Sequence, residues 1–344
     1  MKASMNRVKK LLLLGLGIAI VWSQFSPVIV LGATNNNGNN PTLPGQALEI
    51  DPPLIELSGN RGQTLKTQIQ IRNISSGPVV VTNQINDFTA KGETGVPDII
   101  LHASPNNPYS LLGYISPLPD FTLKSQQLKK LNVNINIPSD ASPGGHYGVI
   151  RFTGTPASLN GKSGVSLSAS LGALILLTVN GHIVENLKTY SFSVGSTAKS
   201  SSGFFQSDPF VFSEVLQNTG NVHVAPTGTI TMKDFFGHTV LKMNVNQGLG
   251  NVLPGTKRQF TEEVSNVAFG GKRFFGRYTA TFNVTYGSSK KTLSGSLSFW
   301  VIPIDLILIW IAVLIGGFFL IRHLIRRYNQ HIVDRAQKSS RKKK

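Results

Sequence analysis

The most constraining feature of the sequence is an apolar run near its C-terminus, residues 304–321, which arginines follow at once. In a helix that rises about 1.5 Å per residue, such a run extends roughly 27 Å, close to the hydrocarbon thickness of a bilayer. Asp305 is its only charge, and it lies in the first turn, where a carboxylate interacts favourably with the positive end of a helix. The run therefore predicts a transmembrane helix over residues 303–322.

The residues after this run are strongly basic. Residues 322–344 contain nine Lys or Arg and one acid, Asp334. Basic residues that flank a span stay on the cytoplasmic side, and they are also attracted to anionic lipid. We therefore expect residues 323–344 to form a basic cytoplasmic tail. The chain is then a single-pass protein of the cell membrane, with everything before Pro303 outside the cytoplasm.

The N-terminus has the three parts of a secretory signal peptide, residues 1–33: a basic start, an apolar run over residues 11–21, and the small-residue site Leu31-Gly32-Ala33. Cleavage is favoured over an uncleaved second anchor, and both place the middle of the chain outside. Residues 34–46 are rich in Asn, have almost nothing to bury, and predict a flexible lead-in.

The charge and the cysteine content exclude several classes of function. The net charge is +17, but the tail carries +8 and the first ten residues +4, which leaves +6 for residues 34–303. This exterior is too weakly basic for a nucleic-acid-binding surface, although it permits a polyanionic partner such as a cell-wall polymer. The absence of cysteine excludes disulfides, thiol catalysis and Cys-ligated metals.

The sequence between the lead-in and the predicted membrane helix has the residue pattern of a β protein. Residues 131–137 and 278–286 alternate apolar and polar side chains with a period of two, which is typical of strands with one wet face. We find no stretch of ten or more exterior residues with apolar positions at helical spacing. The sequence therefore predicts an all-β exterior followed by one C-terminal transmembrane helix.

Two parts of the exterior resemble each other. A strand that ends in Asn73 and a polar turn is echoed by one that ends in Asn218, and the turn 123–126 matches 253–256. A Gly-x-Tyr strand start then occurs at Tyr147 and again at Tyr278. This order over 115–135 residues is typical of an immunoglobulin-like sandwich, in which both tyrosines would occupy a tyrosine corner. We therefore expect one Ig-like β-sandwich over residues 47–182 and a second over residues 187–302.

Residues 138–150 (Pro-Ser-Asp-Ala-Ser-Pro-Gly-Gly-His-Tyr-Gly-Val-Ile) resemble a signature of Ig-like modules in bacterial surface proteins. The opening stretch Gly62-Gln63-Thr64-Leu65, followed by Asn73-Ile74-Ser75, fits the same modules. Over residues 47–325 the arrangement is similar to the WxL-interacting surface proteins of Gram-positive bacteria. The resemblance implies a first domain that contacts peptidoglycan and a second that contacts a host or partner protein.

The stretch from residue 87 to residue 121 is the best candidate for a binding region. A connection this long in a compact domain is usually functional or disordered, and aromatic rings on a proline-stiffened loop suit sugar or protein contacts. Its candidate contact residues are Phe88, Tyr109, Tyr114 and Phe121. The alternative is that these rings cap the core of their own sandwich.

A second candidate is a basic group in the second sandwich. It would contact an anionic polymer or the nearby lipid headgroups, although most such charge runs are simply solvated faces. Its members are Lys257, Arg258, Lys272, Arg273 and Arg277.

The sequence contains no recognisable catalytic or cofactor motif. Its seven histidines are scattered without metal-ligand spacing, and Glu49, Asp51 and Glu56 supply fewer oxygens than calcium needs. We therefore predict a non-enzymatic adhesion or scaffold protein, without cofactor or metal, that presents two Ig-like domains to the cell wall or to a surface protein. The alternative is a membrane-fixed assembly platform that accepts a strand from a client protein.

Overall fold

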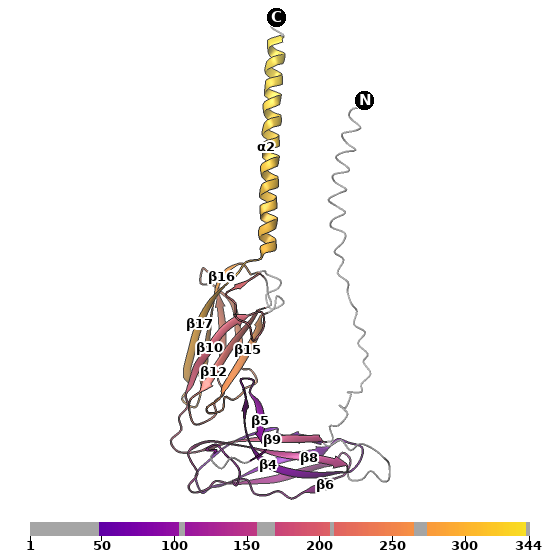
Figure 1. The fold of residues 1–344 in the computed structure, drawn as a ribbon, viewed down its shortest axis with the longest axis vertical. Coiled ribbons are helices and arrows are strands. Elements are labelled where there is room, and N and C mark those ends of the chain that lie inside the picture. The colour runs from indigo at the N-terminus through magenta and orange to yellow at the C-terminus, as the bar shows by residue number, and fades with distance from the viewer. Residues whose placement is uncertain (1–47, 103–106, 157–168, 207–209, 265–273, 342–344) are drawn as a thin grey trace. The chain divides into compact units, whose positions relative to one another are not determined.

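The computed structural model describes residues 48–102, 107–156, 169–206, 210–264 and 274–341 (Figure 1). The predicted signal peptide and lead-in lie outside these residues. The described chain consists of strands, followed by one helix, α2 (Ile304–Arg341). The prediction of an all-β protein with one apolar C-terminal helix is confirmed.

The first group of strands forms two sheets, with orders β1-β3-β7 and β2-β9-β8-β4-β5, and β6 adds to β4. Most neighbours are antiparallel, but β2 pairs with β9 in parallel, so the second and the last strand of the group lie side by side. The bounds are β1 (Leu48–Asp51), β2 (Leu54–Gly59), β3 (Thr64–Asn73), β4 (Val79–Lys91), β5 (Val96–Ile100), β6 (Phe121–Leu123), β7 (Leu128–Asn136), β8 (Gly144–Pro156) and β9 (Ala169–Val179).

The second group also forms two sheets, with orders β10-β12-β15 and β11-β17-β16-β13-β14. The bounds are β10 (Leu187–Gly195), β11 (Phe204–Phe205), β12 (Phe210–Asn218), β13 (Thr227–Lys233), β14 (Thr239–Val245), β15 (Lys257–Val264), β16 (Gly276–Tyr286) and β17 (Lys291–Val301). Each sheet therefore draws its strands from one group only. The exact limits of the two domains stay a prediction.

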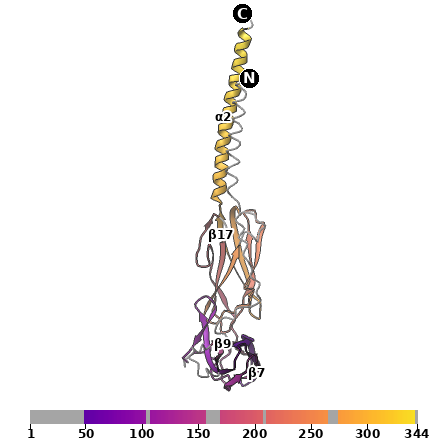
Figure 2. The ribbon, with the colours of Figure 1, turned by 90° about the vertical axis from the view of Figure 1, so that its right-hand side faces the viewer.

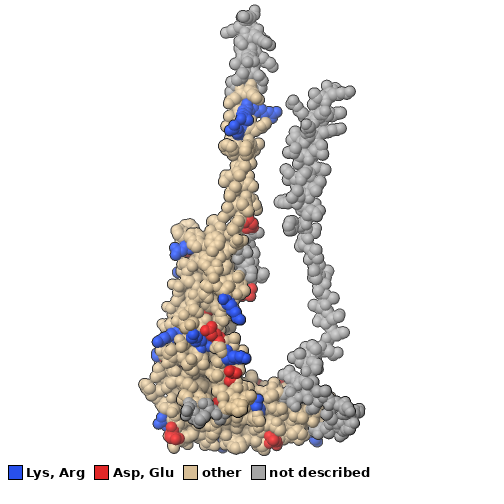
Figure 3. All heavy atoms as spheres, in the orientation of Figure 1, with Lys and Arg blue, Asp and Glu red and all other residues tan. Residues whose placement is uncertain are grey.

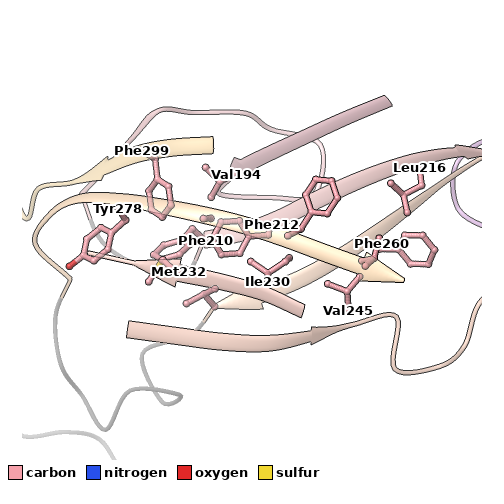
Figure 4. Packing of buried hydrophobic residues seen from close by; sticks show 14 of the residues in the cluster. Val194, Phe210, Phe212, Leu216, Ile230, Met232, Val245, Phe260, Tyr278 and Phe299 are labelled. Carbon is pink, nitrogen blue, oxygen red and sulfur yellow. The ribbon is translucent and has the colours of Figure 1, made fainter. Parts of the chain in front are cut away.

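Each pair of sheets encloses its own apolar core, because alternate residues of every strand point to the same side. In the second sandwich, aromatic rings from β12, β16 and β17 meet between the sheets (Figure 4), and the rings of Phe210 and Phe299 lie 5.3 Å apart. In the first sandwich, Leu131, Val133 and Ile135 point inward from β7, as their alternation predicts.

The repeated asparagines have the same structural role in both sandwiches. Asn73 and Asn218 are fully buried. Each side-chain amide donates a hydrogen bond that closes the turn after its own strand. Each amide also donates to a backbone carbonyl of a second turn. That carbonyl belongs to Leu123 in the first sandwich and to Val252 in the second. The predicted matching of 123–126 with 253–256 is therefore wrong by one residue.

The tyrosine corner occurs in only one of the two sandwiches. Gly144 and Gly276 both have positive φ, and each pairs with the last residue of its final strand, β9 or β17. Counted from these glycines, the counterpart of Tyr278 is His146, and Tyr147 lies one residue further along. Because a one-residue shift moves a side chain to the other face of a sheet, Tyr147 is on the outer face.

Hydrogen bonds agree with this assignment. The Tyr278 hydroxyl donates to the carbonyl of Phe275 at 3.1 Å, which is the upstream backbone contact expected of a tyrosine corner. In the first sandwich His146 takes this place, with its Nε2 2.9 Å from the carbonyl oxygen of Ser142. The prediction of a tyrosine corner is confirmed for Tyr278 and wrong for Tyr147.

The helix α2 begins after only two residues that follow β17, Ile302 and Pro303 (Figure 2). Its segment Ile307–Gln330 contains an 18-residue stretch with a mean hydropathy of 2.2, and none of that stretch is buried against the rest of the protein. On the face shown in Figure 3, the part of the helix nearest β17 lacks blue basic atoms, and a basic group follows farther along. The helix is thus long and apolar enough to cross a membrane, and it continues into the predicted tail.

Candidate binding surfaces

Residues 87–121 are not one long connection as predicted, because β4 continues to Lys91 and β5 lies within them, and the aromatic residues predicted there point inward. Phe88 and Phe121 are 6% and 9% exposed, and the half-buried rings of Tyr109 and Tyr114 pack against two different apolar clusters. The structure therefore brings Phe88 and Tyr109 together beside Tyr147 but separates them from the other two. This placement supports the alternative in which the rings cap the protein's own cores, and a role in partner binding stays a prediction.

The loop is held to its sheet by Asp87, which sequence reasoning did not single out. This side chain is 1% exposed, and its Oδ1 accepts a hydrogen bond from the Leu111 amide at 3.0 Å. Its Oδ2 accepts one from the Asn107 side chain at 3.1 Å. The only signal in the sequence was an acidic residue directly before Phe88 in a strand, and a buried carboxylate requires such donors.

The predicted basic group does not form one patch. Lys257 and Arg258 begin β15, at the end of the second sandwich from which the linker to the first sandwich leaves. Arg277 lies at the other end of its sheet, opposite Trp300 and next to the start of α2. Lys272 and Arg273 lie outside the described residues. Residues close in sequence were thus separated by the length of a strand.

A small apolar cluster joins the two sandwiches at the outer face of β8 and β9. We call it the junction cluster, and it consists of Phe88, Tyr147, Val149, Leu176 and Leu253. Only Leu253 comes from the second sandwich. Because Tyr147 is on the outer face of its sheet, its ring reaches this cluster.

Hydrogen bonds surround the junction cluster. The Tyr147 hydroxyl lies 3.3 Å from Nδ1 of His223, and the Gly145 amide donates to the carbonyl of Asn221 at 2.8 Å. Burial raises the pKa of Tyr147 well above its usual range. Burial also lowers the pKa of His223, an effect that Glu56 opposes. His223 is therefore neutral at pH 7, so its Nδ1 can accept a hydrogen bond from the Tyr147 hydroxyl.

A pocket of about 210 Å³ opens beside this cluster, lined by apolar side chains and by Arg258 and Asn251. It is smaller than the roughly 300 Å³ at which small-molecule pockets begin, so it fits a protruding side chain better than a whole cofactor. The Arg258 guanidinium donates to the Asn251 carbonyl at 2.8 Å. Among the described residues no carboxylate forms a salt bridge with Arg258.

The acidic residues near the start of the first sandwich do not form a metal site among the described residues. Glu49 lies 3.6 Å from Arg72, and Glu56 accepts a hydrogen bond from Asn251 at 2.6 Å. No group of three or more His, Asp or Glu side chains is arranged to hold a metal ion in the described part of the chain.

We expect a charge in the junction cluster to destabilise both sandwiches. In the variant Leu253→Asp, a carboxylate enters an apolar cluster without a partner, at a cost of a few kcal/mol. Differential scanning calorimetry should show a lower unfolding temperature for the first sandwich as well, although the change is in the second. The control Leu128→Asp alters a leucine that is 42% exposed and should leave the unfolding temperatures of both sandwiches unchanged. A shift confined to the second sandwich would contradict coupling through the cluster.

Comparisons with known proteins give a fold resemblance only. No known protein family matches the sequence, and no curated protein matches it. The chain is similar to the class 5 fimbriae chaperone CfaA at 13% identity and a TM-score of 0.36, over 74% of this chain and 99% of that one. It is similar to the E. coli chaperone DraB at 11% identity and a TM-score of 0.33, over 74% and 96% of the two chains. The resemblance to WxL-interacting proteins stays a prediction.

Proposed function

We propose that the chain is a non-catalytic, membrane-anchored protein that presents two Ig-like sandwiches outside the cytoplasm to the cell wall or to a surface protein. The observation that carries this proposal is the direct passage from the last strand β17 into the exposed apolar helix α2, with two residues between them. The arginines that follow the apolar run favour a cytoplasmic C-terminus. Both sandwiches then belong to the external side.

Four of the buried polar side chains in the described part of the chain have architectural roles, which supports a non-catalytic function. Asp87 fixes a loop, His146 replaces a tyrosine corner, and Asn73 and Asn218 close turns. A catalytic base or nucleophile instead needs a reacting position beside it in a cleft. The pocket at the junction offers a cation and apolar walls, which suit recognition of an acidic or amphipathic partner.

The proposal predicts that the full-length protein, in detergent, is retained on purified cell wall or captures a surface protein through the junction pocket. The variant Arg258→Gln should reduce retention several-fold because it removes the charge that faces the pocket. The matched control Lys66→Gln removes one charge from the exposed face of β3 and should be retained like the wild type. If the wild type and both variants are retained equally, Arg258 is not part of the binding site. If none of the three proteins is retained, the protein does not bind the cell wall.

A second function, a strand acceptor for client proteins, is favoured by the free edge of β14. This strand pairs with β13 on one side, and among the described strands no other pairs with it. It contains no proline, so a client strand could pair with the backbone groups on its free side. A photo-crosslinker at Asn244 separates the two functions in cells: a defined protein adduct supports strand addition, and no adduct supports the binding protein.

A further inference from the structure

The end of the second sandwich that meets α2 carries exposed aromatic rings on several separate segments. We call this set the helix-end rim; it consists of Phe204, Phe235, Phe236, Phe275 and Trp300. Their exposed fractions run from 46% for Trp300 to 80% for Phe236. Outside α2, only one other aromatic residue among the described ones is as exposed, Tyr190. Outside α2, the exposed rings among the described residues are thus concentrated at one end of one sandwich.

Strand register establishes that these residues share one end. Trp300 is the penultimate residue of β17, and it lies beside Phe204 of β11 and opposite Arg277 of β16. These three side chains form one row across the outer face of the sheet. Phe275 immediately precedes β16, and Lys233 at the end of β13 leads into the turn that carries Phe235 and Phe236.

The turn between β13 and β14 holds its two phenylalanines away from the core. The Asp234 carboxylate accepts a hydrogen bond from the His238 amide at 2.8 Å, and the Gly237 amide donates to the Asp234 carbonyl at 3.0 Å. The rings of Phe235 and Phe236 contact each other edge to face, with centroids 5.6 Å apart. Two large apolar side chains left in water forgo the stabilisation of burial, so a surface that covers them is expected.

We propose that the helix-end rim inserts into the headgroup layer of the membrane that α2 crosses. The proposal rests on the membrane anchoring described above. Trp300, the rim residue nearest to α2 in sequence, lies four residues before Ile304, a distance of at most about 14 Å when fully extended, and each headgroup layer is roughly 5–8 Å thick. Aromatic rings beside basic side chains such as Lys233 and Arg277 are the composition that prefers this layer.

The contact gives the anchor a second point of attachment. A single helix fixes the depth of the chain but leaves the sandwich free to tilt on a two-residue link. The rim contacts the membrane on different sides of that link, because its rings come from β11, from β17, from the loop before β16 and from the turn after β13. The second sandwich would then stand in a fixed orientation, with the junction pocket turned away from the membrane at its other end.

The chain has no cysteine, so one introduced cysteine carries a single fluorescent probe. Full-length Phe236→Cys and Phe275→Cys proteins, each labelled with an environment-sensitive dye, are reconstituted into phosphatidylcholine and phosphatidylglycerol vesicles. Shallow brominated lipids should quench both probes several-fold more than a probe on the control Leu249→Cys. Leu249 is 62% exposed and follows β14, at the far end of the sandwich.

Two further measurements keep the outcome unambiguous. Phe235→Ser combined with Phe236→Ser should reduce quenching of a probe at residue 275 while leaving the unfolding temperature unchanged, because both side chains are exposed. Flotation with the vesicles reports the anchor alone. Protein that floats but whose rim probes are quenched no more than the control overturns the rim contact, and protein that does not float overturns the anchoring. Probes shielded from water without lipid quenching would assign the rim to a second copy of the chain and also overturn the proposal.

Discussion

Replacing Glu214 by isoleucine is expected to stabilise the second sandwich by about 3 kcal/mol at pH 7. Glu214 is 1% exposed and points into the core of the second sandwich from β12, between Phe212 and Leu216. Neither carboxyl oxygen has a hydrogen-bond partner among the described residues. Burial raises the pKa of Glu214 to about 8. Each pH unit between the ordinary pKa of 4.5 and pH 7 corresponds to about 1.4 kcal/mol. Keeping the buried acid neutral at pH 7 therefore costs about 3 kcal/mol.

The sign of the pH dependence follows from the same pKa. Between pH 4.5, the ordinary value, and pH 8, the folded chain binds a proton that the unfolded chain has released. The free energy of unfolding of the wild type should therefore be fully retained below pH 4.5, fall as the pH rises, and level off above pH 8. In Glu214→Ile this slope should disappear.

Calorimetry of the full-length protein from pH 5 to pH 9 measures both effects, and 3 kcal/mol corresponds to roughly 10 °C in unfolding temperature. The control Glu263→Ile changes an exposed glutamate on β15 and should alter stability by less than about 0.5 kcal/mol. A wild type whose stability does not fall between pH 5 and pH 8 would show that the Glu214 carboxylate has a partner in the folded protein.

The alternation of apolar and polar residues was sufficient to predict an all-β exterior. It predicted the inward faces of β7 and β16, because a strand with one wet face imposes a period of two on its sequence. Counted back from Asn73 and Asn218, the repeat aligns Ile69 with Glu214, and this alignment alone does not decide whether the acid points inward or the strand is irregular. That decision depends on the pairing of β12 with β10 and β15, which are distant in sequence.

The surfaces were less accessible to sequence reasoning than the cores. The Gly-x-Tyr match assigned Tyr147 to an inner corner, whereas the pairing of β8 with β9 turns it outward to the junction cluster. The basic residues looked like one group because they are close along the chain, but Arg258 and Arg277 lie at opposite ends of the sandwich. Both errors arise because single-residue register and long-range pairing determine a surface, and a local pattern contains neither.

Replacing either repeated asparagine by alanine is expected to be among the most damaging changes outside the helix. The Asn218 amide donates to the carbonyls of Val222 and Val252 at 2.8 Å each, and its Oδ1 accepts from the Gly220 amide at 2.8 Å. Alanine leaves these three backbone groups without their partner at a buried turn, and each unsatisfied group costs about 1–3 kcal/mol. We expect a loss of roughly 3–5 kcal/mol from the second sandwich.

The first sandwich should respond in the same way to Asn73→Ala, because that side chain donates to three carbonyls and accepts from the Ser75 amide. Each variant should lower the unfolding transition of its own sandwich most strongly, which calorimetry can resolve. The control Asn244→Ala removes an exposed asparagine from β14 and should be nearly neutral. If Asn218→Ala is as stable as this control, the buried asparagines do not hold the turns. If Asn73→Ala and Asn218→Ala destabilise their own sandwiches equally, the two domains share the same asparagine hydrogen bonds although their surfaces differ.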